Sequence, residues 1–365
     1  MDNKQAFNEL VGSRVRIARE KANMNQSVMA EKLGVASHQI VSQIETGARA
    51  VSTDELFILA ELFGQPVDFF TDPYLIVADQ VLSFRAERSV ADLEGFEKRV
   101  SNLVSAAVRF SDLVGEMVSP FERQLHISRD TSVIKAAGLG AQVAQSLDLG
   151  PIPAAQLQDC IEKKLGIVVM KVDAPHGISG AACHMPEIDL ILINRNEAAC
   201  RQNFDLAHEL FHVLTWSRLP PERHDWINGS KTKVEKLADA FASGLLMPFP
   251  SMKARWDSRD TEVDLHEWIV CNAVEMRVSG LAFYWRLVAC GFLSKSKQAE
   301  IDRSRLSRPD DASQKPLLFC ESFVRHMHQV LEQGKVSARK AASLVGLEVD
   351  EFDSLFASYG LESPF

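Results

Sequence analysis

The chain has 365 residues, enough for two or three domains with hydrophobic cores of their own. Its hydrophobic fraction of 46% and charged fraction of 24% are ordinary for a soluble globular protein, and the net charge of −9 argues against nucleic-acid binding over the whole surface. The first residues lack a charged flank followed by an apolar core, and no apolar run is long enough to cross a bilayer. The scattered cysteines include no CxxC pair, so we expect a cytoplasmic protein with reduced thiols and no membrane contact.

The first seventy residues are expected to form five short helices in a compact all-α domain. The N-caps and glycine stops that divide the segment are Asn25, Gly34, Ser37 and Gly47. A further helix begins at Ser52 or Thr53, with Glu55 in its first turn. In the helix that contains "RVRIAREKANMNQ", Arg14, Arg16 and Arg19 are expected to face solvent.

The stretch "MNQSVMAEKLGVASHQIVSQIETG" resembles the phage-repressor type of helix-turn-helix, the XRE family. The resemblance places Gln26 at the start of the first motif helix, where the family contacts DNA phosphate. It also gives the recognition helix polar side chains for the major groove, namely Ser37, His38, Gln39 and Gln43. If two recognition helices read paired half-sites of a double-stranded DNA operator, two copies of the chain are needed, so we expect a homodimer. Two questions stay open: the register, because the interval between the two glycines is one residue longer than in phage repressors, and whether the domain instead serves only protein interactions.

Residues 73–149 are interpreted as a linker with an extended segment, "TDPYLIVADQVLSFRAE", followed by a helical region over 93–147. Beyond them, "GIVVMKVD" is expected to be a buried strand, and "EIDLILIN" a short apolar strand ending in a polar turn. The preceding "HGISGAACHM" is a candidate hairpin partner. A small sheet is therefore predicted just before the helix that carries the most informative motif.

That motif is "FDLAHELFHVLTW", in which two histidines stand four residues apart with a glutamate beside the first. On a helix, His208 and His212 lie one turn apart on the same face, where both can reach one ion. Glu209 lies about 100° around the helix, close enough to act on water at that ion. The helix is otherwise largely apolar, so these polar groups would be buried and need partners.

A catalytic zinc needs a third protein ligand and one open position. The helix "KVEKLADAFASGLLMP" offers Glu235 and Asp239, four residues apart on one face. In one assignment Glu235 binds the metal and Asp239 hydrogen-bonds a ligand histidine, which fixes its tautomer. The reverse assignment is also open.

The combination "RQNFDLAHELFHVL" and "EKLADAFASGLLMP" resembles the ImmA/IrrE metallopeptidase family. The resemblance implies a zincin-like domain, with Glu209 as the catalytic base and a metal set of His208, His212 and Glu235. Zinc is the expected ion and manganese an alternative. A substrate peptide is expected to add to the exposed edge of the "DLILIN" strand. The oxyanion-stabilising residue is left open among His184, His224 and Tyr284, and a merely structural metal site remains the alternative.

The polar stretch over 303–316 is expected to be a linker. Beyond it, Ser337 caps a helix that Gly346 ends, and Asp350 begins another. This pair is interpreted as a protein-interaction or oligomerisation module, and a second DNA-binding element is the alternative.

We therefore expect a mainly α fold with a small β-sheet, divided into a helix-turn-helix domain (1–72), a linker and helical region (73–149), a zincin-like metallopeptidase domain (150–300) and a C-terminal helical module (315–365). The expected function is a DNA-binding transcriptional regulator with zinc-dependent endopeptidase activity. Its protein substrate would be a helix-turn-helix repressor or antitoxin, or a copy of itself, in a stress, mobile-element or phage-defence response. The alternatives are a non-proteolytic transcription factor with a sensor or structural metal domain, and the toxin or effector half of a toxin–antitoxin pair.

Overall fold

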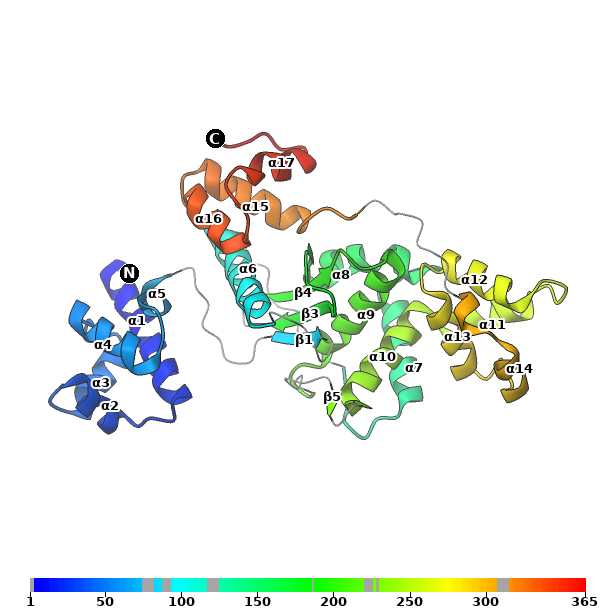
Figure 1. The fold of residues 1–365 in the computed structure, drawn as a ribbon, viewed down its shortest axis with the longest axis horizontal. Coiled ribbons are helices and arrows are strands. Elements are labelled where there is room, and N and C mark those ends of the chain that lie inside the picture. The colour runs from blue at the N-terminus through cyan, green and yellow to red at the C-terminus, as the bar shows by residue number, and fades with distance from the viewer. Residues whose placement is uncertain are drawn as a thin grey trace. The chain divides into compact units, whose positions relative to one another are not determined.

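A computed structural model describes residues 3–73, 82–86, 93–116, 125–185, 187–219, 226–227, 230–306 and 315–365. The chain forms two compact units, Met1–Asp79 with Lys98–Arg109 and Gln80–Glu97 with Phe110–Phe365 (Figure 1). Helices dominate both units and a small sheet lies in the second, which confirms the expected fold class. The four expected domain boundaries stay predictions.

The first unit contains the short helices expected from the capping pattern. They are α1 (Asn3–Lys21), α2 (Gln26–Leu33), α3 (His38–Glu45), α4 (Thr53–Phe63) and α5 (Val67–Thr71). Their shared core is formed by apolar side chains from every helix, including Val15, Met29, Val41, Ile44, Leu59 and Phe70. Helical periodicity predicts that Val15, Met29, Val41 and Ile44 are buried, and they are, whereas Val28, which follows the same periodicity, is 40% exposed.

The ends of these helices follow their capping residues. Asn25 accepts a hydrogen bond from the Val28 amide at 2.9 Å and starts α2. Gly34 ends α2 in the left-handed conformation, with φ of 69°. Ser52 and Glu55 form a reciprocal capping box at the start of α4, which satisfies two amides that the helix itself cannot.

The expectation that Arg14 and Arg19 face solvent is wrong. Arg14 is only 3% exposed and its Nη1 donates to the Phe69 carbonyl oxygen at 3.0 Å. Arg19 pairs with the buried Glu45, with 3.2 Å between Nη2 and Oε2. Both guanidinium groups reach partners on other helices of this unit, and a helical pattern read one helix at a time does not show such partners.

The sheet of the second unit has four strands in the order β1-β3-β4-β2. The strands are β1 (Leu82–Ala86), β2 (Val168–Val172), β3 (Ile178–His184) and β4 (Asp189–Asn194). The expected hairpin of β3 and β4 is antiparallel, whereas β2 runs parallel to β4. All six residues of β4 are buried, as its apolar sequence predicted.

The prediction that the "DLILIN" strand has an exposed edge is wrong. This strand is β4, and it hydrogen-bonds β3 on one side and β2 on the other. The edge strands of the sheet are β1 and β2. A run of apolar residues indicates that both faces of a strand are buried, but it does not show how many neighbouring strands pair with its edges.

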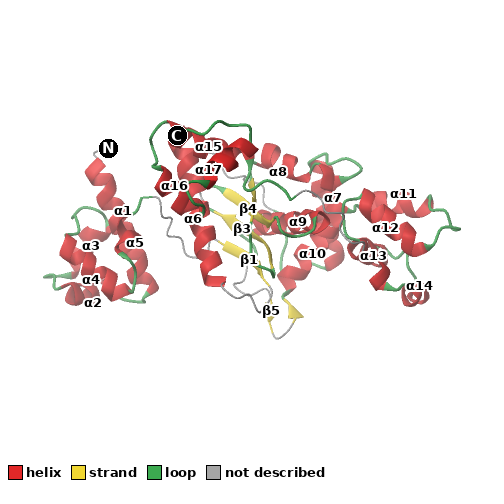
Figure 2. Cartoon of the chain, turned by 45° about the horizontal axis from the view of Figure 1, so that its top comes forward, coloured by secondary structure: helices red, strands yellow, loops and turns green. Residues whose placement is uncertain are grey.

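Helices cover the sheet and position the functional side chains (Figure 2). Helix α9 (Ala199–Thr215) packs on β3 and β4, and α10 (Lys233–Leu246) packs on α9. The region 93–147 contains α6 (Leu93–Val114) and α7 (Val133–Ser146), and residues 125–132 between them are not helical. Helix α10 makes its most extensive contact with α7, larger than its contact with α9.

The α7–α10 contact depends on two glycines that bring the helix backbones together. A Cβ atom added at Gly244 would lie 1.9 Å from the Ala137 carbonyl oxygen. One added at Gly140 would lie 2.1 Å from the Phe241 carbonyl oxygen. Any side chain at either position would force the helices apart. This crossing fixes α10, and with it the two carboxylates predicted for the metal site.

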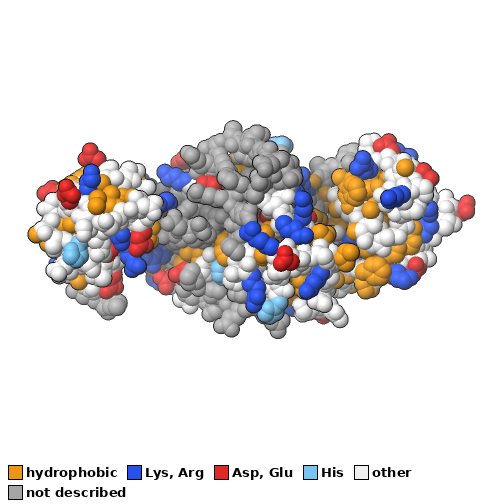
Figure 3. Space-filling view, turned by 90° about the horizontal axis from the view of Figure 1, so that it is seen from below, with side chains coloured by type: hydrophobic (Ala, Val, Ile, Leu, Met, Phe, Trp, Pro, Cys, Tyr) orange, Lys and Arg blue, Asp and Glu red, His pale blue; other side chains and the backbone are white. Residues whose placement is uncertain are grey.

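A helical lobe follows α10 and exposes large apolar side chains. It comprises α11 (Phe249–Asp257), α12 (Leu265–Glu275), α13 (Gly280–Ala289), α14 (Lys295–Glu300) and the 3-10 helix η2 (Arg303–Leu306). Trp285 is 48% exposed and Val274 is 56% exposed. Figure 3 shows hydrophobic side chains gathered over this lobe, on the right of the view.

The C-terminal segment closes one edge of the sheet. The Phe319 amide donates to the Lys171 carbonyl oxygen of β2 at 2.7 Å, and Arg195 bonds the Pro316 carbonyl at 3.0 Å. The helices beyond are α15 (Glu321–Glu332), α16 (Ala338–Val345) and α17 (Glu351–Ser358). Ser337 caps α16 and Gly346 ends it, as expected.

The six cysteines are free thiols; Cys160, Cys183 and Cys320 are buried, whereas Cys271 is exposed. In the described part of the chain, no helix is both long enough and apolar enough to cross a membrane.

Candidate functional site

Helix α9 brings the two motif histidines and their neighbouring glutamate into the protein interior. His208 and Glu209 are fully buried and His212 is 1% exposed. Leu210 and Phe211 of the same helix belong to the hydrophobic core of the unit. The site is therefore a polar cluster inside an apolar environment, which is stable only if its members satisfy one another or a ligand.

Three side chains converge on one point between α9 and α10. The Nε2 atom of His208 lies 3.0 Å from Oε2 of Glu235, and Nε2 of His212 lies 3.2 Å from Oε1 of the same carboxylate. The two Nε2 atoms are 3.2 Å apart. One donor atom of each residue thus lies within 4.8 Å of the other two, and all three residues are buried.

This arrangement fits a small divalent cation. His208 has a carboxylate, that of Asp239, 3.0 Å from its Nδ1 atom, so a neutral ring carries its proton there and leaves Nε2 as a lone-pair donor. Two imidazole nitrogens and a carboxylate then face one another, and a positive charge between them, from a bound ion or from a proton on a ring, removes the repulsion. In a tetrahedral zinc site, ligand atoms about 2.0–2.1 Å from the ion are roughly 3.3 Å from one another. The observed separations of 3.0 to 3.2 Å are close to that value.

Glu235 and Asp239 occupy different positions around His208. Glu235 faces the ring nitrogens that converge, whereas Asp239 faces the opposite nitrogen of His208. Asp239 also accepts a hydrogen bond from Lys231 Nζ at 2.5 Å, a contact that the sequence analysis missed. Lys231 lies just before the start of α10, where no spacing rule points to it. The geometry favours Glu235 as the ligand and Asp239 as the group that orients His208.

The electrostatics of the cluster favour an ionised Glu235. Burial raises the pKa of this carboxyl, but the charge of His212 and hydrogen bonds from both histidines outweigh burial and hold the pKa well below its ordinary value. Thr232, the N-cap of α10, accepts a hydrogen bond from the Glu235 amide at 3.3 Å and anchors the residue in the first helical turn.

Glu209 lies against strand β3. A Cβ atom added at Gly180 of β3 would be 3.2 Å from Glu209 Cγ and 3.4 Å from its Oε1. Glycine at this position therefore lets the strand pass directly beside the carboxyl group. A peptide bound along the sheet at this point would lie next to the candidate base.

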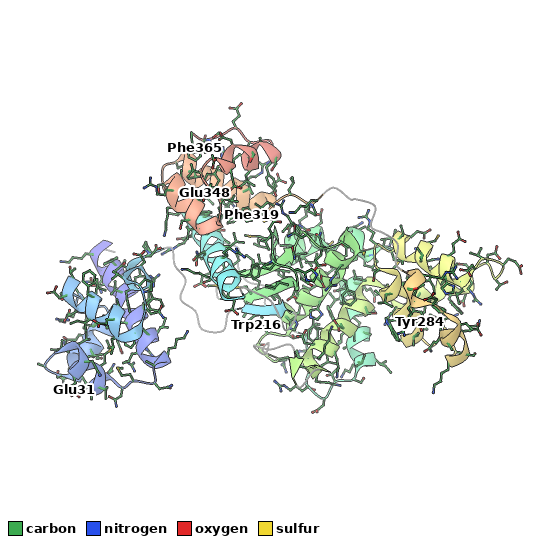
Figure 4. All side chains as sticks on the ribbon, viewed as in Figure 1. Glu31, Trp216, Tyr284, Phe319, Glu348 and Phe365 are labelled. Atoms are coloured by element: carbon green, nitrogen blue, oxygen red, sulfur yellow. The ribbon has the colours of Figure 1, made fainter. Side chains whose placement is uncertain are left out.

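The three candidates for oxyanion stabilisation have different outcomes. His184 lies at the end of β3, with Nδ1 2.5 Å from Asp189 Oδ1 and its ring 5.8 Å from that of Trp216. Tyr284 is buried in α13, among the helices of the lobe in Figure 4. His224 lies outside the described residues. His184 is on β3, which packs against α9.

The predicted DNA-contacting side chains lie on α2 and α3 in the first unit. His38, Gln39 and Gln43 are exposed on α3, and Ser37 occupies its N-cap without a side-chain capping bond. Gln26 starts α2 as predicted, and its amide donates to Glu45 at 2.7 Å. The exposed face of α3 thus presents two glutamines and a histidine, side chains that pair with base edges.

With this geometry established, two segments of the chain can be compared with known families, and each matches a family model. Residues 15–70 match the family model described as helix-turn-helix. Residues 162–284 match the family model described as the IrrE N-terminal-like domain, a peptidase family. The two matches confirm the expected fusion of an XRE-type helix-turn-helix to an ImmA/IrrE-like domain. No curated protein matches the chain.

Proposed function

We propose that the protein is a DNA-binding transcriptional regulator that cleaves another protein with a metal-dependent endopeptidase site. The convergence of His208, His212 and Glu235 beside Glu209 carries this proposal. The substrate is a helix-turn-helix repressor or antitoxin, or a second copy of the chain, and cleavage relieves repression during stress, mobile-element induction or phage defence. The two family matches support a regulator with a peptidase-like domain.

Each side chain of the site has a separate task in this proposal. His208, His212 and Glu235 hold the ion, with zinc as the first choice and manganese as the alternative. When bound, the ion supplies Lewis acidity toward water and the scissile carbonyl. Glu209 accepts the proton of the attacking water and returns it to the leaving amine. Asp239 keeps the His208 proton on Nδ1, so that Nε2 stays available.

Elemental analysis tests the metal site directly. Purified wild-type protein should contain about one zinc or manganese ion per chain, and the variant His208→Ala should contain none. His176→Ala changes a histidine that belongs to no group of metal-ligating side chains among the described residues, and it serves as the matched control. Equal metal content in His208→Ala and the wild type would rule out the proposed ligand set.

The peptidase activity is tested by comparing protein N-termini in cells that express the wild type or Glu209→Gln. New N-termini should appear with the wild type and disappear with the variant, which is expected to lose roughly 10²–10⁴ in rate while keeping its metal. Glu267→Gln, an exposed position on α12, controls for the loss of a negative charge. A metal-containing protein that produces no new N-termini under any inducing condition would instead support the non-proteolytic regulator.

On the DNA side, we propose that α3 enters the major groove as a recognition helix and that two copies of the chain read paired half-sites. The exposure of His38, Gln39 and Gln43 supports this assignment, as does the match over residues 15–70. Gln26 at the start of α2 is assigned to the DNA phosphate backbone.

A further inference from the structure

The strand β1 comes from a part of the chain that lies outside the peptidase family match. Strands β2, β3 and β4 all fall within the matched residues 162–284, whereas β1 comprises Leu82–Ala86. It runs antiparallel to β3 and pairs with it along five positions. Both Figure 1 and Figure 2 draw it on the side of the sheet toward α10. A sheet of β2, β4 and β3 alone would present β3 as an open edge on that side.

The edge that β1 covers is the one beside the candidate catalytic base. Gly180 of β3 is in close contact with Glu209, and the same Gly180 is the register partner of Arg85 in β1. The ladder is irregular between Arg85 and Ala86, so the departure from regular pairing falls next to Glu209. The backbone of β1 is therefore paired with β3 at the same residue that lies beside Glu209.

An endopeptidase that cuts an extended segment needs a place to hold that segment, and a sheet edge provides it through backbone hydrogen bonds. Within the described structure, β3 already hydrogen-bonds β4 on one side and β1 on the other. An incoming peptide therefore cannot pair with β3 while β1 is in place.

We propose that the edge of β3 beside Glu209 binds the substrate protein as an extended strand, and that Leu82–Ala86 is a resident strand of the chain itself that occupies this edge until substrate replaces it. This inference rests on the proposed peptidase function. The exchange replaces one antiparallel ladder by another, so the backbone hydrogen bonds lost with β1 are regained with substrate. A tethered strand competes at an effective concentration on the order of mM, which suppresses binding of a dilute substrate.

A fluorescent peptide with the sequence of residues 80–88, QVLSFRAER, serves as the probe, and fluorescence anisotropy measures its binding. All measurements use the full chain with Glu209→Gln, so that binding is read without cleavage. A peptide of the same composition in scrambled order is the control. Binding of the probe does not require turnover. The probe can therefore fail to bind while the peptidase proposal holds, and it can bind while the peptidase proposal fails.

The first variant locks β1 in place. Leu82 is the register partner of the native Cys183, so Leu82→Cys puts two thiols directly opposite one another. Cα atoms of such pairs are about 4.5–5.5 Å apart, within the range that a disulfide spans. Oxidation of Leu82→Cys with oxidised glutathione should abolish peptide binding, and dithiothreitol should restore it. The double variant Leu82→Cys with Cys183→Ser should not respond to oxidation.

The second pair of variants releases β1. Adjacent residues of an antiparallel strand point their N–H groups to opposite sides, so only one of Ser83→Pro and Phe84→Pro removes a donor to β3. One of the two should bind the probe at least about tenfold more tightly than the wild type, and the other should not. Ser83→Ala and Phe84→Ala keep the amide and serve as the matched controls.

These outcomes decide the proposal. Loss of probe binding on oxidation and tighter binding in one proline variant would establish the resident strand. The proposal would be overturned if Leu82→Cys bound the probe equally well in its oxidised and reduced forms. It would also be overturned if both proline variants bound the probe as the wild type does. Self-cleavage within residues 82–86 of the metal-loaded wild type would also overturn it, because the strand would then be a substrate and not a resident.

Discussion

The two matched segments hold their candidate functional side chains in opposite ways. On α3, His38, Gln39 and Gln43 are exposed and take no part in the core of their unit. On α9, His208, Glu209 and His212 are almost completely buried. Exposed recognition groups can change without cost to folding, whereas buried donors link folding to the ligand they hold. Stability measurements should therefore report on the metal site and remain insensitive to the DNA-contacting side chains.

The largest effect should come from removing the metal. A ligand present at about a thousandfold excess over its dissociation constant stabilises the folded state by roughly 4 kcal/mol. Chelation should therefore lower the unfolding temperature of the second unit by several degrees and leave α1–α5 unchanged. Calorimetry, combined with hydrogen exchange of the two units, measures this difference. A chelator that lowered the stability of His212→Ala by as much as that of the wild type would contradict the prediction.

Gly244→Ala should also destabilise the second unit strongly, by about 3 kcal/mol, because the added Cβ would overlap the α7 backbone. Gly138→Ala on α7 is the matched control, because nothing lies within 4 Å of a Cβ atom at that position. There the loss of glycine flexibility should stabilise the protein by about 0.5–1 kcal/mol. Urea denaturation measures both changes. Equal effects of the two substitutions would mean that α7 and α10 do not cross at Gly244.

Gln43→Ala should weaken DNA binding and leave stability unchanged. A good bidentate contact to adenine contributes about 1–3 kcal/mol of discrimination, so affinity for an operator selected by the wild type from random DNA should fall by roughly 5- to 150-fold. Gln5→Ala replaces an exposed glutamine of α1 in the same unit and should leave binding intact. An unchanged DNA affinity in Gln43→Ala would remove this residue from the recognition surface.

The smallest effect concerns the capping box of α4. Ser52→Ala should cost the first unit about 1 kcal/mol, since it leaves the Glu55 amide without its partner.

Burial raises the pKa of Glu55, but hydrogen bonds from Arg49 and Ser52 outweigh it and lower the pKa below its ordinary value of 4.5. A carboxyl with a lowered folded-state pKa stabilises the fold above that ordinary value and loses this contribution as the pH falls through the folded pKa. The stability deficit of Glu55→Gln, measured in urea, should therefore be present at pH 7 and shrink below pH 4.5.

Local geometry explains what the sequence could predict. A helix places residues four apart on one face, so the pairs His208 with His212 and Glu235 with Asp239 follow from spacing alone. Caps such as Asn25 act on amides two or three residues away and were equally readable. The structure then brings α9 and α10 together, so that His208, His212 and Glu235 lie close to one another. The role of each of these residues stays a prediction.

Contacts between distant segments could not be predicted from these patterns. Strand order depends on which backbones pair, and nothing in the apolar sequence of β4 distinguishes an interior strand with two partners from an edge strand with one. The pairing of β1 with β3 joins segments almost a hundred residues apart. Lys231 and Arg14 likewise find partners whose position depends on the packing of other helices.

The crossing of α7 and α10 also bears on how much chain the peptidase half needs in order to fold. Helix α7 ends at Ser146, before the family match begins at residue 162, yet its Gly140 lies against the backbone of α10. A fragment cut at residue 162 would leave the face of α10 that packs on α7 around Gly244 open to water, and we expect it to aggregate. The segment that matches the family model is thus shorter than the piece of chain that we expect to fold by itself.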